Sequence, residues 1–194
     1  RTFHDISDYI TINISSPNTE NLRDFHDQIK LEELISSIEQ EKKKLKSKTP
    51  IVVKISPDIS KEQATQISQI LLKHEIEGII VSNTTEGNRE KLQSTSKHQK
   101  GGLSGKPLET ISNQLINIFY NLLKGKIEII GVGGVDSGRS AYDKFLAGAN
   151  FIQLYTGMVY QGPNIVGKIK KELKQILINE GVNNFKDIVG KKSN

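Results

Sequence analysis

The chain has 194 residues, with 27 Lys and Arg against 22 Asp and Glu and a formal net charge of +5. Its 35% of hydrophobic residues suffices for a buried core, and no apolar run is long enough to cross a bilayer. Cysteine is absent, which excludes disulfides, thiolate metal sites and a cysteine base within this sequence. The first residue is Arg1 rather than Met, so we expect a piece of a longer protein whose targeting segment lies elsewhere.

Short apolar runs rich in β-branched residues alternate along the chain with longer segments of helical periodicity. These runs are apolar on both faces, as the strands of a covered parallel sheet are. They predict five strands, at Asp8–Ile14, Pro50–Ile55, Gly78–Ser82, Ile127–Val132 and Phe151–Tyr155. Between the strands, apolar residues recur three and four positions apart, for example within residues 31–38, and this spacing predicts crossover helices. Ser60 and Ser137 stand where they would cap two of these helices.

A repeated strand–helix pattern fits either an open doubly wound α/β sheet or a closed (β/α)8 TIM barrel. Ligands of both folds bind beyond the carboxyl ends of the strands, and here polar or glycine-rich segments follow all five strands. Five consecutive ends of this kind favour the barrel, because an open sheet uses mainly its switch point. A barrel has eight strands, so we expect residues 1–194 to be the carboxyl-terminal portion of a single barrel domain, with about its last five βα units. The polar loop Thr85–Lys100 would lie over the mouth of the barrel.

The glycines near the last strands predict a phosphate site. Gly131–Gly134 reads GVGG, but Asp136 occupies the third glycine position of a dinucleotide-binding fingerprint, so that fingerprint fails. With Gly105 and the Tyr155–Thr156 turn, these glycines would form the phosphate cup of a barrel. The alternative is that they serve tight turns only.

Neutral polar side chains gather after the first and third strands, among them Asn13, Asn18 and Asn83. Amides and hydroxyls match a planar heterocycle with alternating N–H and C=O groups, whereas local turns are the alternative explanation. Lys54 is a lone ammonium in an apolar strand. It could form a Schiff base or place a fixed charge beside an anionic ligand or reduced cofactor, and the alternative is an ion pair inside the barrel.

Other charged residues point to no separate site. The four histidines show no spacing typical of a metal site, so we expect them on the surface or in helices and predict no metal. The lysine-rich stretches Glu41–Lys48 and Lys168–Asn194 are interpreted as solvated helix faces, with nucleic acid or an anionic membrane as the alternative. We expect Arg23 to position the loop after the first strand and Asp58 to cap a turn.

Six motifs, in this order and spacing, resemble the class 2 dihydroorotate dehydrogenases over nearly all of the chain: NISSPNT, VVKISPDIS, IVSNTT, GGLSGKPL, IIGVGGVDSG and IQLYTG. The resemblance implies an FMN-binding barrel preceded by a small helical domain for membrane attachment and quinone access. It also implies oxidation of (S)-dihydroorotate to orotate with a ubiquinone-type quinone as acceptor, in pyrimidine biosynthesis. The implied location is the inner mitochondrial membrane, or alternatively a bacterial plasma membrane, with no nucleic acid as partner.

The resemblance also implies roles for single residues. Ser16 would be the catalytic base that takes the C5 proton while C6 gives a hydride to flavin N5, and Thr19 would relay the proton. Lys54 would lie beside the N1/C2 edge of the flavin and Ser82 beside its ring system. The pyrimidine and its carboxylate would be held by Asn13, Asn18, Asn83 and Thr84, with Asn13 also at the cofactor, and the FMN phosphate by Gly105, Gly134, Tyr155 and Thr156.

Class 1 relatives use a cysteine base, so Ser16 and the absence of cysteine both indicate class 2. The sequence departs from the family pattern at Asn21, where Gly is usual, at Ser56, where Ala is usual, and at Ser82, where Thr is more usual. Two alternatives remain: another FMN-dependent barrel enzyme similar to the dihydrouridine synthases, and a non-catalytic domain that binds anions or nucleic acid.

Overall fold

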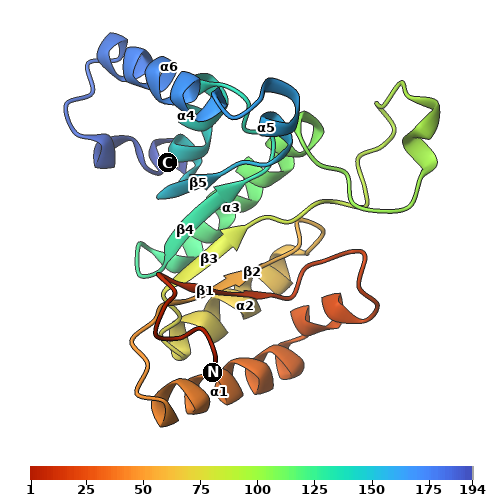
Figure 1. Cartoon of the computed structure of the whole chain (residues 1–194), viewed down its shortest axis with the longest axis vertical. Coiled ribbons are helices and arrows are strands. Elements are labelled where there is room, and N and C mark those ends of the chain that lie inside the picture. Colours follow the sequence, from red (N-terminus) through yellow and green to blue (C-terminus); the bar gives the residue numbers. More distant parts are fainter. Residues whose placement is uncertain (194) are drawn as a thin grey trace.

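A computed structural model describes residues 1–193 and shows one parallel sheet of five strands arranged in chain order (Figure 1). The strands are β1 (Ile10–Asn13), β2 (Ile51–Lys54), β3 (Gly78–Val81), β4 (Glu128–Val132) and β5 (Phe151–Gln153). All five predicted strands are confirmed, although each is shorter than expected. The polar residues that follow each apolar run leave the sheet, and they form the loops at its carboxyl edge.

Helices connect the strands and cover one face of the sheet. They are α1 (Gln28–Lys44), α2 (Lys61–Lys73), α3 (Glu109–Leu123), α4 (Gly138–Ala147), α5 (Thr156–Gln161) and α6 (Ile165–Asn179). Short 3-10 helices occupy Leu22–His26 (η1), Thr95–His98 (η2), Lys106–Leu108 (η3), Phe185–Ile188 (η4) and Lys191–Ser193 (η5). Among residues 1–193, no helix combines the length and the apolar character needed to span a membrane.

The two faces of the sheet pack differently. Val53, Ile79 and Ile129 belong to the main core, which the sheet forms with α1, α2 and α3. Val52, Ile80 and Ile130 form a separate small cluster. Because side chains alternate along a strand, Lys54 projects from the same face as Val52. The register confirms this placement, since Lys54 pairs with Ile80.

Both predicted helix caps are present. The Ser60 hydroxyl accepts a hydrogen bond from the Gln63 amide (3.2 Å), and the Gln63 side chain accepts one from the Ser60 amide (3.0 Å). At α4 the Ser137 hydroxyl accepts from the Ser140 amide (3.2 Å), and the Ser140 hydroxyl accepts from the Ser137 amide (3.0 Å). These reciprocal bonds satisfy amides that a helix start would otherwise leave unpaired. They also fix where the loops after β2 and β4 end.

The long polar loop after β3 projects from the body of the molecule (Figure 1). Its base is closed by an antiparallel bridge, in which the Thr85 amide donates to Leu103 (3.1 Å) and the Leu103 amide donates to Thr85 (2.7 Å). Inside the loop, the Arg89 guanidinium donates to four backbone carbonyl oxygens, those of Glu86, Lys97, Gln99 and Gly101. One arginine therefore holds a loop that has little secondary structure of its own.

The two lysine-rich stretches lie largely in solvent. Lys43 and Lys44 are exposed at the end of α1, and so are Lys168, Lys170, Lys171 and Lys174 on α6. Asn194, the last residue of the second stretch, lies outside the described residues.

Candidate functional site

A pocket of about 1010 Å³ opens at the carboxyl edge of the sheet, where the loops after β2 to β5 meet. Loops at this edge carry the ligand sites of parallel α/β folds. The pocket brings together residues from four strand ends. Eight of the predicted site residues line it: Lys54, Ser82, Asn83, Thr84, Gly105, Gly134, Tyr155 and Thr156.

One end of the pocket is built from glycine backbone. Gly105 (φ 78°) lies so close to Thr156 that a Cβ on it would come within 2.9 Å of Thr156 Cγ2. Gly134 (φ 76°) lies against Glu109, and a Cβ there would approach Glu109 Cβ to 2.4 Å. Both positions thus require glycine for conformation and for space. Lys106 adds a cation to this end, and its hydrogen bond to Glu109 raises its pKa above the usual value.

Lys54 supplies the charge at the other end. It is the last residue of β2, and its side chain leaves the sheet beside Ile80. Burial lowers the pKa of this ammonium below the usual value for lysine, and no charged partner among residues 1–193 offsets the effect. A positive charge held in partly buried surroundings acts more strongly on a nearby anion than the same charge in water.

A cluster of amides and hydroxyls joins the loops after β1 and β3. The Asn83 side-chain amide donates to the Ser15 hydroxyl (2.9 Å), which in turn donates to the side-chain Oδ1 of Asn13 (2.7 Å). The side-chain Oδ1 of Asn83 accepts from the Thr84 backbone amide (2.8 Å). These bonds fix the orientation of both asparagines, so their remaining donors and acceptors are held in a defined arrangement.

The segment from Ser16 to Thr19 lies beside the pocket and is not part of its lining. The half-buried Ser16 accepts a hydrogen bond from the Asn18 amide at its hydroxyl oxygen (3.2 Å). The segment touches the base of the long loop, since a Cβ on Gly102 would lie 3.1 Å from Pro17 Cγ and overlap Thr84 Oγ1. Thr19 is exposed. The structure therefore groups these predicted residues with Asn83 and Thr84 but leaves Thr19 at the rim.

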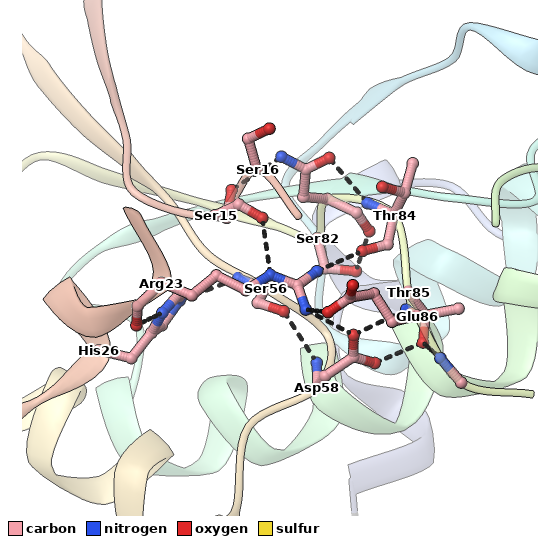
Figure 2. A network of polar contacts seen from close by, with 12 residues as sticks. Ser15, Ser16, Arg23, His26, Ser56, Asp58, Ser82, Thr84, Thr85 and Glu86 are labelled. Carbon is pink, nitrogen blue, oxygen red and sulfur yellow. Dashed lines mark hydrogen bonds and ion pairs between the residues drawn. The ribbon is translucent and has the colours of Figure 1, made fainter. Parts of the chain in front are cut away.

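Arg23 connects the loops that carry the site, as expected for a residue that positions the first loop (Figure 2). It donates to the carbonyl oxygens of Ser15 (3.3 Å) and Thr84 (3.2 Å). Its Nη1 also pairs with Asp58 (3.1 Å) and Glu86 (2.7 Å). Three strand ends thus depend on one guanidinium, whose planar array of donors suits several acceptors at once.

The prediction that Asp58 caps its turn is wrong, because its carboxylate bonds to other loops and Ser56 closes the turn. Besides pairing with Arg23, its carboxylate accepts from the Thr85 hydroxyl and from the Glu86 amide (2.9 Å). The turn itself is closed by the Ser56 hydroxyl, which accepts from the Asp58 amide (3.1 Å). Asp58 accordingly bridges the loops after β2 and β3.

His26 lies in η1, as the prediction of surface or helical histidines allows, but it is only 3% exposed, which the sequence did not indicate. Its Nε2 accepts a hydrogen bond from the Ser56 amide (3.1 Å), so its Nδ1 carries the proton and donates to the Arg23 carbonyl oxygen (2.8 Å). Burial lowers the pKa of this imidazole, which is consistent with a neutral ring. No spacing rule identifies a lone histidine of this kind.

No metal is indicated by the side chains of the described residues, since no three His, Asp or Glu among them come together as a set of ligands. The pocket at this edge is lined instead by neutral polar side chains, by glycine backbone and by cations that include Lys54 and Lys106.

Comparisons with known proteins agree with this arrangement. Residues 1–177 match the family described as dihydroorotate dehydrogenase. The mitochondrial dihydroorotate dehydrogenase (quinone) of Mus musculus is 41% identical over 187 residues, which are 95% of this chain and 47% of the mouse protein. The dihydroorotate dehydrogenase (quinone) of Buchnera aphidicola is 46% identical over 169 residues, which are 85% of this chain and 50% of that protein. The chain thus spans about half the length of these relatives.

The fold is also shared. A crystal structure of ligand-free DHODH from Eimeria tenella superposes with a TM-score of 0.95 at 35% identity, covering 100% of this chain and 58% of that one. A second structure, of the same enzyme with ferulenol, gives a TM-score of 0.92 and covers 96% of this chain and 54% of that one. The five βα units are therefore part of a (β/α)8 barrel, as predicted. By its sequence match, its fold and the residues at its carboxyl edge, the chain belongs to the dihydroorotate dehydrogenase family.

Proposed function

We propose that the protein oxidises (S)-dihydroorotate to orotate with FMN as cofactor and a ubiquinone-type quinone as electron acceptor. The observation that carries this proposal is the single pocket that combines a glycine-lined end with Lys54, Ser82, Asn83 and Thr84 in a chain of this family. The names of the mouse and Buchnera relatives specify a quinone-dependent enzyme.

The pocket fits FMN in size and in the chemistry of its donors. Its volume of about 1010 Å³ lies at the upper end of the range of roughly 300 to 1,000 Å³ that is common for small-molecule sites. Backbone amides at Gly105 and Gly134, with Tyr155 and Thr156, would hold the phosphate. Lys54, Ser82 and Asn13 would lie beside the ring system. When bound, FMN accepts the hydride from the substrate and passes the electrons on to the quinone.

Ser16 would remove the C5 proton of the substrate. In the structure its oxygen already accepts a hydrogen bond from the Asn18 amide, and such a bond stabilises negative charge on the oxygen when the hydroxyl proton departs. Thr19 would carry the proton onward to solvent, which suits its exposed position at the rim. A closed site that excludes water would let a serine act as a base beyond its reach in solution.

The asparagine cluster would recognise the substrate ring. Asn13, Asn18, Asn83 and Thr84 offer donors and acceptors that match the alternating N–H and C=O groups of a dihydropyrimidine. The bonds among Asn83, Ser15 and Asn13 fix these side chains before any ligand arrives, which lowers the entropy cost of binding.

We further propose that residues 1–194 are the carboxyl-terminal portion of a single barrel domain whose preceding segment associates with a membrane. Support comes from the chain's coverage of only about half of its relatives. The inner mitochondrial membrane is the proposed location, because the mouse relative is mitochondrial by name. A bacterial plasma membrane is the alternative, because Buchnera is a bacterium.

Anaerobic flavin spectroscopy tests the proposed reaction. The purified intact protein should be yellow, dihydroorotate should bleach its visible absorbance in the absence of oxygen, and a soluble quinone should restore the colour. A colourless protein would contradict the cofactor assignment. Bound flavin that dihydroorotate leaves oxidised would contradict the substrate.

A further inference from the structure

A second buried lysine lies behind the pocket, on α4. Lys144 is 0% exposed and its ammonium donates to two side chains of α3, the Ser112 hydroxyl (3.0 Å) and the Asn113 carbonyl oxygen (2.9 Å). Its aliphatic part packs on β4, where a Cβ on Gly131 would lie 3.2 Å from Lys144 Cδ. The proposed chemistry of the pocket makes no use of this residue.

A buried ammonium without a carboxylate partner is costly to maintain. No ion pair reaches Lys144 from residues 1–193, and burial lowers its pKa to about 7 despite the opposing charge of Glu109. A lysine that served only to fill space could be replaced by an apolar side chain of similar volume at no cost in stability. We therefore expect the charge of Lys144 to serve function rather than stability.

Ser112 connects this ammonium to the pocket wall. Its hydroxyl donates to the carbonyl oxygen of Val132 (2.5 Å), the last residue of β4, and Val132 lines the pocket. The Val132 carbonyl and the Gly133 N–H belong to one planar trans peptide and point in opposite directions. Because Ser112 holds the carbonyl, the Gly133 N–H points away from Ser112. Gly133 (φ 113°) packs directly over this helix, and a Cβ on it would lie 3.4 Å from Ser112 Cβ. Lys144 thus lies beneath the glycine turn that we assign to phosphate.

We propose that Lys144 is a positioning residue for the phosphate end of the bound flavin: its buried positive charge favours an anion at the Gly133–Gly134 turn, and its bond to Ser112 fixes the Val132 peptide. The inference rests on the proposed function, because it places FMN in this pocket. Charges separated by protein interior interact more strongly than charges in water, so a cation need not touch the phosphate to act on it.

The geometry has a consequence for pH dependence. An anion in the pocket favours the charged form of Lys144 and raises its pKa above about 7. Affinity for the phosphate therefore falls as the pH rises from 7 toward 9, because Lys144 loses the proton whose charge favours the anion. The second ionisation of a phosphate monoester, near pH 6, lies below this window.

The other charged groups that face this part of α4 are carboxylates with basic or amide partners. On α3, Glu109 pairs with Lys106, whose pKa is raised. Asp143 on α4 itself pairs with Arg139 and with Lys192 of η5. On α6, Glu172 accepts from the Gly138 amide (2.6 Å). Lys54 also has a lowered pKa, but it lies at the ring end of the pocket.

Comparing FMN with riboflavin isolates the phosphate, since riboflavin has the same ring without it. We would titrate the apo form of the intact protein with each flavin at pH 7, 8 and 9 and follow the quenching of flavin fluorescence. If FMN raises the Lys144 pKa by about one unit from about 7, the wild-type preference for FMN over riboflavin should shrink about fivefold from pH 7 to pH 9, because half of the lysine is already neutral at pH 7. Lys144→Gln keeps a donor for Ser112 but no charge, so its preference should be about fivefold weaker at pH 7 and independent of pH.

Lys174→Gln, at an exposed position on α6, is the matched control and should behave as the wild type. Circular dichroism checks the fold of each variant. The pH dependence of the wild-type preference for FMN over riboflavin tests the inference without any substitution. A wild-type preference for FMN that does not change with pH, or a folded Lys144→Gln protein that retains the wild-type preference, would overturn the role of Lys144 alone. A wild type that binds neither flavin would overturn the proposed function and this inference with it.

Discussion

Arg23 donates a hydrogen bond of 3.2 Å to the carbonyl oxygen of Thr84, and so joins the loop after β1 to the loop after β3. These two strands are not neighbours, because β2 lies between them. The same guanidinium also forms an ion pair with Asp58 in the loop after β2, so it contacts all three loops (Figure 2). Asparagines on both joined loops are the proposed substrate ligands, so Arg23 sets the distance between them.

Arg23→Gln should therefore impair catalysis more than it impairs folding. We expect kcat to fall about tenfold, equivalent to roughly 1.4 kcal/mol, because the loops lose their common anchor. Lys30→Gln is the matched control, since its ion pair with Asp24 in the same region is exposed on both sides and contributes little. Steady-state kinetics of both variants makes the comparison. Equal effects of the two substitutions would show that Arg23 acts only as a surface charge.

Ser16→Ala tests the proposed base. The variant should retain FMN, while its flavin is reduced by dihydroorotate roughly 10² to 10⁴ times more slowly, which is the usual contribution of a positioned general base. Anaerobic stopped-flow absorbance measures this step, and orotate binding serves as the control for an intact site. A reduction rate close to that of the wild type would mean that another group takes the proton.

His26 predicts a loss of stability in acid. The unfolded imidazole has a pKa near 6.5, whereas burial holds the folded one lower, so the unfolded chain binds protons first. The contribution to the free energy of unfolding is complete above pH 6.5 and is lost as the pH falls through the folded pKa. Protonation would also set an Nε2–H against the Ser56 amide. Urea unfolding from pH 7 to pH 5 measures the slope, and His26→Gln should flatten it while costing about 1 to 3 kcal/mol at pH 7 for the unpaired Ser56 amide.

His74 predicts the opposite slope. Its Nδ1 faces Glu39 (2.6 Å) and its Nε2 faces Glu32 (2.9 Å), so both ring nitrogens act as donors when the ring is charged. The hydrogen bond to Glu39 is the main cause of its raised pKa. This contribution is complete below pH 6.5 and is lost as the pH rises through the folded value. In a urea series extended from pH 5 to pH 9, His74→Gln should lower stability at pH 6 and remove the decline above pH 6.5. An unchanged decline would assign it to other groups.

Much of the fold could be predicted because its signals are local. Each strand is a short β-branched run, and Ser60 with Gln63 forms a cap that is visible in four residues of sequence. His26 and Lys144 could not be found in this way. Their partners lie about 30 positions away, at Ser56 and Ser112, and their burial depends on how the loops and helices pack. In the sequence, Lys144 resembles any lysine on an amphipathic helix.

In the candidate site too, the residues could be predicted from the sequence but their contacts could not. Motif order predicted which residues gather at the carboxyl edge, and eight of them line one pocket. The bonds among Asn13, Ser15 and Asn83 could not be predicted, because they join loops about 70 residues apart. Side-chain orientation of this kind follows from tertiary packing rather than from local sequence.

The edges of the sheet predict how residues 1–194 would behave if they were expressed alone. β1 and β5 are the outer strands of the described sheet, and each presents a backbone edge that can pair with another chain. Large apolar side chains of β5 and of the segment that follows it are exposed, including Phe151 (58%), Tyr155 (80%) and Tyr160 (85%). We therefore expect oligomers in size-exclusion chromatography with light scattering, strong binding of a hydrophobic dye and poor retention of FMN. Co-expression with the segment that precedes these residues in a full-length relative should cover both edges and restore a defined species. A monodisperse monomer that unfolds cooperatively and retains flavin would show that five βα units form a stable domain by themselves.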